Sequence, residues 1–203
     1  MIRELSGDEV VRLHGELEEI HRGSGDPIFP PGIKNRGLLE AAVKRPFTAA
    51  FGHEHFPGLE QKAAILVWSM ICYHLFHNGN KRTAIAALRS FLQHNDHALV
   101  SDSEDIIRFS ELVVGMCEDR TERPYDVIAA WIVKHCLERI STRERRWRDV
   151  LADLKRFGIG STYGRGFIHL KRVEGPVLTL SLRGFTSLAQ PSTLRLIRKF
   201  FAI

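Results

Sequence analysis

The sequence lacks the features of membrane-bound and exported proteins. No apolar run reaches the roughly 18–20 residues that a membrane-spanning helix needs, and the closest approach, residues 63–70, is short. The first five residues, MIREL, contain no apolar stretch that could serve as a signal peptide. We therefore expect a cytoplasmic protein that has no membrane partner.

Cysteine is scarce, and metal-binding spacings are missing. The three cysteines, Cys72, Cys117 and Cys136, are far apart in apolar helical patterns, so we expect reduced core residues. No C-x-x-C or H-E-x-x-H motif occurs. His53 and His55 lie two apart, with His77, His94 and His97 farther along the chain. Exposed loop histidines are favoured over a metal cluster.

Internal repeats and low-complexity tracts are also missing, whereas charge is distributed unevenly. Of the 203 residues 44% are hydrophobic and 26% charged, which is typical of a folded protein. Residues 1–140 hold 16 Lys and Arg against 20 Asp and Glu, a net charge of −4. Residues 141–203 hold 13 against 4, a net charge of +9. This asymmetry indicates two functional units, the second of which faces an anionic partner.

Hydrophobic periodicity predicts a mainly α protein. A capping box from Ser6 to Glu9 opens the first helix, which continues to Arg22. Further helices are expected at Arg36–Arg45, Leu59–Leu75, Lys81–His94, Ser103–Glu118 and Pro124–Arg139. After a charged hinge at residues 141–146 we expect a helix at Trp147–Phe157, strands at Gly166–Arg172 and Val177–Arg183, and a basic helix at Ser192–Phe201. The predicted organisation is a helical bundle over 1–140, followed by a small α+β (α-β-β-α) domain over 141–203.

The densest chemistry lies in residues 74–83, HLFHNGNKRT. The pattern predicts a helix end, a tight turn around Gly79 and a new helix whose first amides have no intrahelical partners. Such a helix start binds anions, and Lys81 and Arg82 add two cations there. Asn80 offers a side-chain amide to a phosphate oxygen, and His74 can take a proton from a hydroxyl near pH 7. These parts together indicate phosphate-group transfer.

This string resembles the signature of the Fic/Doc family, H-x-F-x-[D/E]-[G/A]-N-[G/K]-R. Lys81 stands where Fic enzymes carry Gly, and Ile85 stands where they carry a second Arg, so the chain is more similar to the Doc branch. Residues 32–46 resemble the segment that precedes the motif in Doc-type proteins. The resemblance covers about residues 5–120.

The resemblance implies a role for each matching residue. His74 would be the general base, Phe76 would anchor the motif in the core, and Gly79, Asn80, Lys81 and Arg82 would hold the phosphates of ATP or another nucleoside triphosphate. Fic proteins transfer AMP, whereas Doc phosphorylates a threonine of elongation factor Tu. It also implies a cognate antitoxin, and the inhibitory motif [S/T]-x-x-x-E-[G/N] that some Fic proteins carry is not found convincingly.

Asn78 departs from the family pattern, which has Asp or Glu at this position to bind Mg²⁺. Because Mg²⁺ prefers charged oxygen ligands, we expect a weakened metal site. An alternative function follows, in which the chain is an inactive Fic/Doc-like regulator that keeps a nucleic-acid-binding tail.

The second domain contains the string Trp147-x5-Asp153-Leu-Lys-Arg-Phe-Gly158, two predicted strands and the string Pro191-Ser-Thr-Leu-Arg-Leu-Ile197. With these features, residues 147–203 resemble HicA-type toxins, which have a double-stranded-RNA-binding-like fold. The catalytic His of the Gly-Ser-His-His string in HicA is missing or displaced in residues 163–169 here, although a ribonuclease toxin stays an alternative. A fold of this type would bind RNA or DNA, and a solvated basic face is the competing interpretation. The candidate phosphate contacts are Arg165, Lys171, Arg172, Arg195, Arg198 and Lys199.

Overall fold

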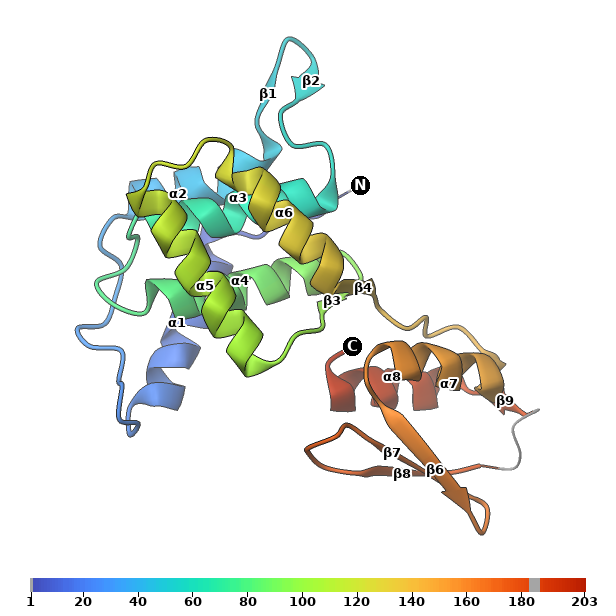
Figure 1. Cartoon of the computed structure of the whole chain (residues 1–203). Coiled ribbons are helices and arrows are strands. Elements are labelled where there is room, and N and C mark those ends of the chain that lie inside the picture. The colour runs from blue at the N-terminus through green and yellow to red at the C-terminus, as the bar shows by residue number, and fades with distance from the viewer. Residues whose placement is uncertain (1, 183–186) are drawn as a thin grey trace. The chain divides into compact units, whose positions relative to one another are not determined.

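The chain forms two units in the computed structural model, which describes residues 2–182 and 187–203 (Figure 1). The first unit is Met1–Cys136 and the second is Leu137–Ile203, so the division lies four residues before the one expected from sequence. Among the described residues, no helix is long and apolar enough to cross a membrane.

The first unit is built almost entirely of helices. In chain order its elements are α1 (Gly7–His21), α2 (Arg36–Lys44), the 3₁₀ helix η1 (Arg45–Phe47), β1 (Ala49–Ala50), β2 (His53–Glu54), α3 (Leu59–Cys72), α4 (Asn80–His94), β3 (His97–Leu99), α5 (Ser103–Glu118) and α6 (Pro124–His135). The strands β1 and β2 form a short antiparallel hairpin. The mainly α fold predicted from sequence is confirmed.

The helix α3 lies at the centre of this unit, packed against α4, α5 and α6 (Figure 1). Nine of its fourteen residues are buried, which agrees with its nearly uninterrupted apolar sequence. The core extends into α4 through residues spaced three or four apart, such as Ala84, Leu88 and Phe91. The start of α4 is therefore fixed by the packing of the rest of the helix.

The first helix begins where the sequence predicted. The Ser6 hydroxyl accepts a hydrogen bond from the Glu9 amide, and the Ser6 amide donates to the Glu9 carboxylate at 2.8 Å. This capping box satisfies two amides that the helix leaves without partners. Burial along α1 is confined to one side, at Val10 and His14.

Two helices of the first unit end three or four residues earlier than the sequence indicated. The helix α3 ends at Cys72 instead of Leu75, because Tyr73 caps it and His74 takes a left-handed conformation (φ 46°). The helix α6 ends at His135 instead of Arg139, and the next residues extend into β4 (Cys136–Glu138) at the boundary between the units. In both places the sequence stays apolar past the end of the helix, so periodicity alone extends the prediction too far.

The expectation that all three cysteines are reduced is wrong for two of them. Cys72, the last residue of α3, and Cys117, near the end of α5, form a disulfide whose Cα atoms are 5.8 Å apart. The two helices bring these ends together although 45 residues separate them in sequence. Cys136 is free, and burial raises the pKa of its thiol to about 12.

The second unit contains β5 (Arg145–Arg146), α7 (Trp147–Arg156), β6 (Gly160–Gly164), β7 (Phe167–Lys171), β8 (Leu178–Ser181), β9 (Leu188–Ala189) and α8 (Pro191–Phe201). The strands β6, β7 and β8 form an antiparallel sheet in that order, and β5 pairs with β9. The expected α-β-β-α order thus gains three strands, the two-residue β5 and β9 and the longer β6. The strand β6 has the sequence GSTYG, which lacks the apolar alternation that predicts a strand. Arg183, the last residue of the second predicted strand, lies outside the described residues.

Candidate functional site

The candidate site is the turn that joins α3 to α4, where His74 is placed by an unusual backbone conformation. His74 follows the cap of α3 and has φ 46°, a left-handed conformation that costs a side-chain-bearing residue energy. This bend leaves the His74 side chain exposed on the wall of the pocket that contains the start of α4. His74 is therefore open to an incoming hydroxyl group.

Gly79 ends the turn and precedes the first residue of α4. It has φ 74°, and a Cβ atom built there would lie 2.9 Å from the Ile28 side chain. Both the dihedral angle and the close approach of Ile28 require glycine. The loop that contains Ile28 thus packs directly onto the turn.

Asn80 holds the turn closed through its side chain. Its Oδ1 accepts the Phe76 amide at 2.9 Å, and its Nδ2 donates to the Phe76 carbonyl at 2.9 Å. These two bonds fix the backbone on both sides of a residue that is 1% exposed. The sequence assigned Asn80 to phosphate binding, and in the structure its side chain shapes the loop that would do the binding.

The start of α4 has the properties of an anion site. Its N-cap residue, Gly79, has no side chain with which to cap the first amides, which face outward at the positive end of the helix dipole. Lys81 and Arg82 lie in the same first turn and line the same pocket. Backbone N–H groups and two cations therefore line one pocket, and the phosphate cradle expected from the sequence stays a prediction.

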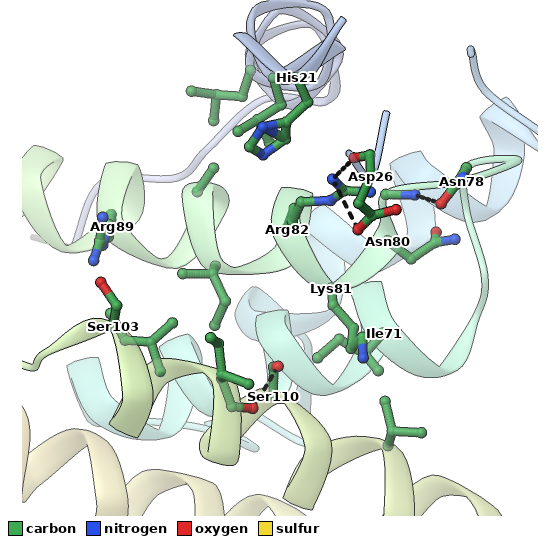
Figure 2. A pocket seen from close by; sticks show the side chains of 18 of the residues that line it. His21, Asp26, Ile71, Asn78, Asn80, Lys81, Arg82, Arg89, Ser103 and Ser110 are labelled. Atoms are coloured by element: carbon green, nitrogen blue, oxygen red, sulfur yellow. Dashed lines mark hydrogen bonds and ion pairs between the residues drawn. The ribbon is translucent and has the colours of Figure 1, made fainter. Parts of the chain in front are cut away.

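An acidic residue from the loop before α2 occupies part of this cradle. The Arg82 guanidinium donates to the Asp26 carbonyl at 2.8 Å and lies 3.5 Å from the Asp26 carboxylate. Figure 2 shows Arg82 turned toward Asp26 while Lys81 points away from that pair. The Asp26 side chain is largely exposed, so its ion pair with Arg82 is weak.

Phe76 anchors the motif by stacking on a buried histidine of α1. The His14 and Phe76 rings are 4.0 Å apart between centroids and nearly parallel. His14 Nδ1 lies 2.8 Å from the Thr83 hydroxyl, and its Nε2 lies 2.8 Å from Glu18. Burial lowers the pKa of His14, although the nearby Glu18 carboxylate opposes this shift. His14 of α1 therefore contacts both the turn, at Phe76, and the start of α4, at Thr83.

Asn78 does not present a metal ligand in this structure. Its Oδ1 accepts the Gly79 amide at 2.6 Å, and its Nδ2 donates to the Phe29 carbonyl at 2.9 Å. No group of three or more His, Cys, Asp or Glu side chains that could hold a metal ion occurs in residues 2–182 and 187–203. The donor set at Asn78 thus does not fit a resident Mg²⁺.

The pocket around these residues is large enough for a nucleotide. Its volume is about 1200 Å³, and its walls come from α1, α4, α5 and the loop before α2. Figure 2 shows His21 of α1 on one side of α4, and Ser103 and Ser110 of α5 on the other. Among the pocket residues that sequence reasoning missed are Leu13, Leu17, His21, Asp26, Ser103, Ile106, Ile107 and Ser110. They come from segments distant in sequence, so no linear motif marks them.

The remaining candidate residues lie elsewhere. His53 is on the exposed β1–β2 hairpin and His55 follows it, also exposed. In the second unit Lys171 is exposed on β7, whereas the Arg172 guanidinium donates to the Phe201 carbonyl at 3.1 Å and so ties α8 to the sheet. Arg165 lies in the β6–β7 turn, and the other predicted contacts, Arg195, Arg198 and Lys199, lie on α8. The six cations therefore come from three places: the β6–β7 turn, the end of β7 and α8.

Comparison with known proteins agrees with this geometry. The model of the Fic/DOC family matches residues 4–92, which include the pocket wall from α1 and the turn at 74–82. A curated relative, Toxin Doc of Mycolicibacterium smegmatis, is 41% identical over 81 residues. The match covers 40% of this chain and 62% of the relative, so the chain spans less than two thirds of the relative's length. Residues 4–92 of this chain are therefore similar to the Fic/Doc family, and the named relative is a Doc toxin, which supports the resemblance drawn from the motif.

Proposed function

We propose that the Fic/Doc domain transfers a phosphate-containing group from a nucleoside triphosphate to a protein hydroxyl, and that the chain acts as a Doc-type toxin. The observation that carries this proposal is the convergence in one pocket of His74, the uncapped start of α4, Lys81 and Arg82. A base and a phosphate cradle within one pocket are the two parts that such a transfer needs.

His74, Lys81 and Arg82 each have a part in the proposed transfer. His74 takes the proton of the attacking hydroxyl, whose oxygen forms a bond to phosphorus as the phosphoanhydride bond breaks. The leaving group is a nucleoside diphosphate when the γ phosphate is attacked and pyrophosphate when the α phosphate is attacked. Lys81, Arg82 and the first amides of α4 offset the negative charge on the phosphates. Mg²⁺ would arrive with the nucleotide phosphates, because Asn78 does not fit a resident ion.

The transferred group can be identified by labelling. The full chain is incubated with a lysate and ATP labelled at either the α or the γ phosphate, in parallel with His74→Ala. Transfer of γ label to protein is expected if Lys81 gives the nucleotide the Doc-like orientation, and elongation factor Tu is the first target to test. Transfer of α label instead identifies AMPylation. Transfer of neither label overturns the proposal, as does equal transfer by His74→Ala.

Asn78 favours one second candidate, a phosphate-binding regulator that does not transfer. The family places an acidic metal ligand at position 78, and this chain has an asparagine there. The Asn78 side-chain oxygen already accepts the Gly79 amide. This candidate predicts nucleotide binding that Arg82→Ala abolishes, without transfer of either label. The labelling experiment and a binding titration together separate the two functions.

We further propose that a separate antitoxin restrains the chain. Apolar side chains of α1 and α5, such as Leu17, Ile106 and Ile107, line the pocket beside the cradle, and Ile107 is 56% exposed. An exposed apolar strip next to a reactive site is suited to an inhibitory helix. Co-expression of a neighbouring small gene that restores growth and co-purifies with the chain would support this, and Ile107→Glu should abolish the co-purification.

A further inference from the structure

The sheet of the second unit has one covered face and one open face. Along β7 the residues Ile168 and Leu170 are buried, whereas Phe167, His169 and Lys171 between them are exposed. Figure 1 shows α7 and α8 on one side of β6, β7 and β8. We infer that the buried residues of β7 face these two helices. The open face therefore carries an aromatic ring, an imidazole and an ammonium group in one row.

The neighbours of this row are small. In the register of the sheet, Phe167 lies between Gly164 and Ser181, and His169 lies between Thr162 and Thr179. Lys171 lies opposite Gly160. The side chains of β7 thus rise above residues that are glycines or short hydroxyl side chains, so flat groups can approach the two rings without obstruction.

The geometry of the row is partly fixed. His169 Nδ1 lies 2.8 Å from the Thr179 hydroxyl, which orients the imidazole across the sheet. A hollow of about 730 Å³ lies at the Lys171 end, lined by His169, Lys171, Thr162 and Gly160 among others. At the other end Arg165 and Gly166, both with positive φ, form the two-residue β6–β7 turn, so a further cation lies next to Phe167.

The charge of this part of the chain selects the partner. Residues 141–203 carry a net charge of +9, and Phe167 is 47% exposed in this setting. A partner that is both anionic and rich in flat rings matches a stacking row with cations at both ends. Unpaired nucleic acid has this chemistry, because its bases stack on aromatic side chains while its phosphates meet Lys and Arg. A duplex does not, since its bases are already stacked on one another.

We propose that the open face of the β6–β7–β8 sheet, with Phe167, His169, Lys171 and Arg165, binds single-stranded nucleic acid. This site is separate from the pocket of the Fic/Doc domain and does not depend on transfer by His74. Of the cations considered from sequence alone, Lys171 and Arg165 belong to the site, while Arg172 is used to hold α8.

The experiment measures fluorescence anisotropy of labelled 20-nucleotide strands with the full chain at low salt. The strands are oligo-U, oligo-dT and an RNA duplex of the same length. The test variant is Phe167→Ala with Lys171→Gln, and the matched control is Phe200→Ala with Lys199→Gln on α8, where Phe200 is also partly exposed. Far-UV circular dichroism and a thermal melt establish that both variants remain folded.

The expected result is binding of the single strands that the test variant weakens about tenfold or more, since loss of one stacked base contact has an effect of this size. The control should change affinity by less than about threefold, because one exposed lysine contributes little on its own. Loss of one phosphate contact at Lys171 should lower the slope of log affinity against log salt by about 0.7. Comparison of oligo-U with oligo-dT identifies whether RNA or DNA is preferred.

Four outcomes would overturn the proposal. The first is no binding of any single strand at low salt. The second is tighter binding of the duplex than of both single strands. The third is a larger loss of affinity from the α8 control than from the sheet variant. The fourth is complete competition by polyglutamate. Either of the last two results identifies a general basic surface. If Phe167→Ala with Lys171→Gln fails to fold, His169→Ala tests the same face, since His169 is exposed.

Discussion

Arg82 binds the backbone and faces the carboxylate of Asp26, 56 residues earlier in the chain. In the proposed function Arg82 binds a phosphate, so an anion of the protein itself lies beside the proposed phosphate site. Asp26 lies in the loop that also packs Ile28 against Gly79. In the same loop the Phe29 carbonyl accepts a hydrogen bond from the Asn78 side-chain amide. The loop before α2 is therefore part of the site, not a connection that merely passes it.

Replacing Asp26 should tighten anion binding. In Asp26→Asn the backbone bond to Arg82 is retained, while the competing negative charge is removed. Because the ion pair is exposed and worth at most about 1 kcal/mol, we expect up to about fivefold tighter binding of ATP in an equilibrium titration. Asp8→Asn is the matched control, since Asp8 is also exposed and paired with an arginine, Arg36, outside the pocket. Equal affinity of Asp26→Asn and wild type would show that Asp26 does not compete.

The linear part of the site could be predicted from sequence, whereas the part assembled from distant segments could not. His74, Gly79, Lys81 and Arg82 are neighbours in sequence, and a turn followed by a helix start suffices to bring them together. Asp26 enters only because the loop folds back over the turn, and a lone Asp beside Gly and Pro carries no signal of that. Asn80 was assigned to phosphate because amides bind phosphates, but the nearest unpaired backbone groups, those of Phe76, take its side chain.

The same distinction holds for the fold. Helices with strong apolar periodicity, such as α4, end at the residue expected from sequence. The strand β6 was missed because its residues are small and exposed, and its conformation depends on pairing with β7. The Cys72–Cys117 pair could not be predicted because it depends on how α3 and α5 pack.

Converting Asn78 to the family's acidic residue should restore metal dependence at a cost in stability. Asn78→Asp keeps an acceptor for the Gly79 amide, but it loses the donor to Phe29 and places a carboxylate near that carbonyl. We expect the free energy of unfolding to fall by about 1–2 kcal/mol. We also expect Mg²⁺ to raise ATP affinity more in the variant than in wild type.

Urea unfolding and ATP titrations at several Mg²⁺ concentrations measure both effects. Asn95→Asp is the control, because the Asn95 amide also donates to backbone carbonyls, at Arg3 and Phe91, away from the cradle. It should lose stability without a change in metal dependence. If Mg²⁺ affects Asn78→Asp and wild type equally, position 78 is not where a metal acts.

Gly79→Ala should destabilise the domain by about 2–4 kcal/mol. The left-handed conformation costs about 1–2 kcal/mol for a residue with a Cβ atom, and crowding against Ile28 adds about 1–2 kcal/mol. Gly15→Ala is the matched control, since Gly15 lies inside α1 with nothing within 4 Å of a built Cβ, and it should stabilise by up to about 1 kcal/mol. Chemical unfolding of the two variants measures both changes in the free energy of unfolding, a decrease for Gly79→Ala and an increase for Gly15→Ala. Equal effects would contradict the packing of Ile28 on the turn.

His14 should make the domain less stable in mild acid. Burial lowers the pKa of His14 below its ordinary value of 6.5, so the unfolded chain binds a proton more readily than the folded one. Stability from this residue is complete above pH 6.5 and declines as the pH falls from there toward the folded-state pKa. Urea unfolding of wild type at pH 7.5 and 5.5 should therefore show a larger loss than that of His14→Gln. A pH dependence identical in both proteins would mean that His14 is not responsible.

The cysteines allow a test of how α3 and α5 are joined. Purified without reductant, the native chain should react slowly with a thiol reagent at pH 8, because a pKa of about 12 leaves roughly one Cys136 thiolate in 10⁴. The denatured chain should release one thiol before reduction and three after it. Reduction should lower the free energy of unfolding by about 2–4 kcal/mol, since the bridge closes a long loop. Cys136→Ser should release none before reduction, and two or three thiols in the unreduced denatured wild type would contradict the bridge.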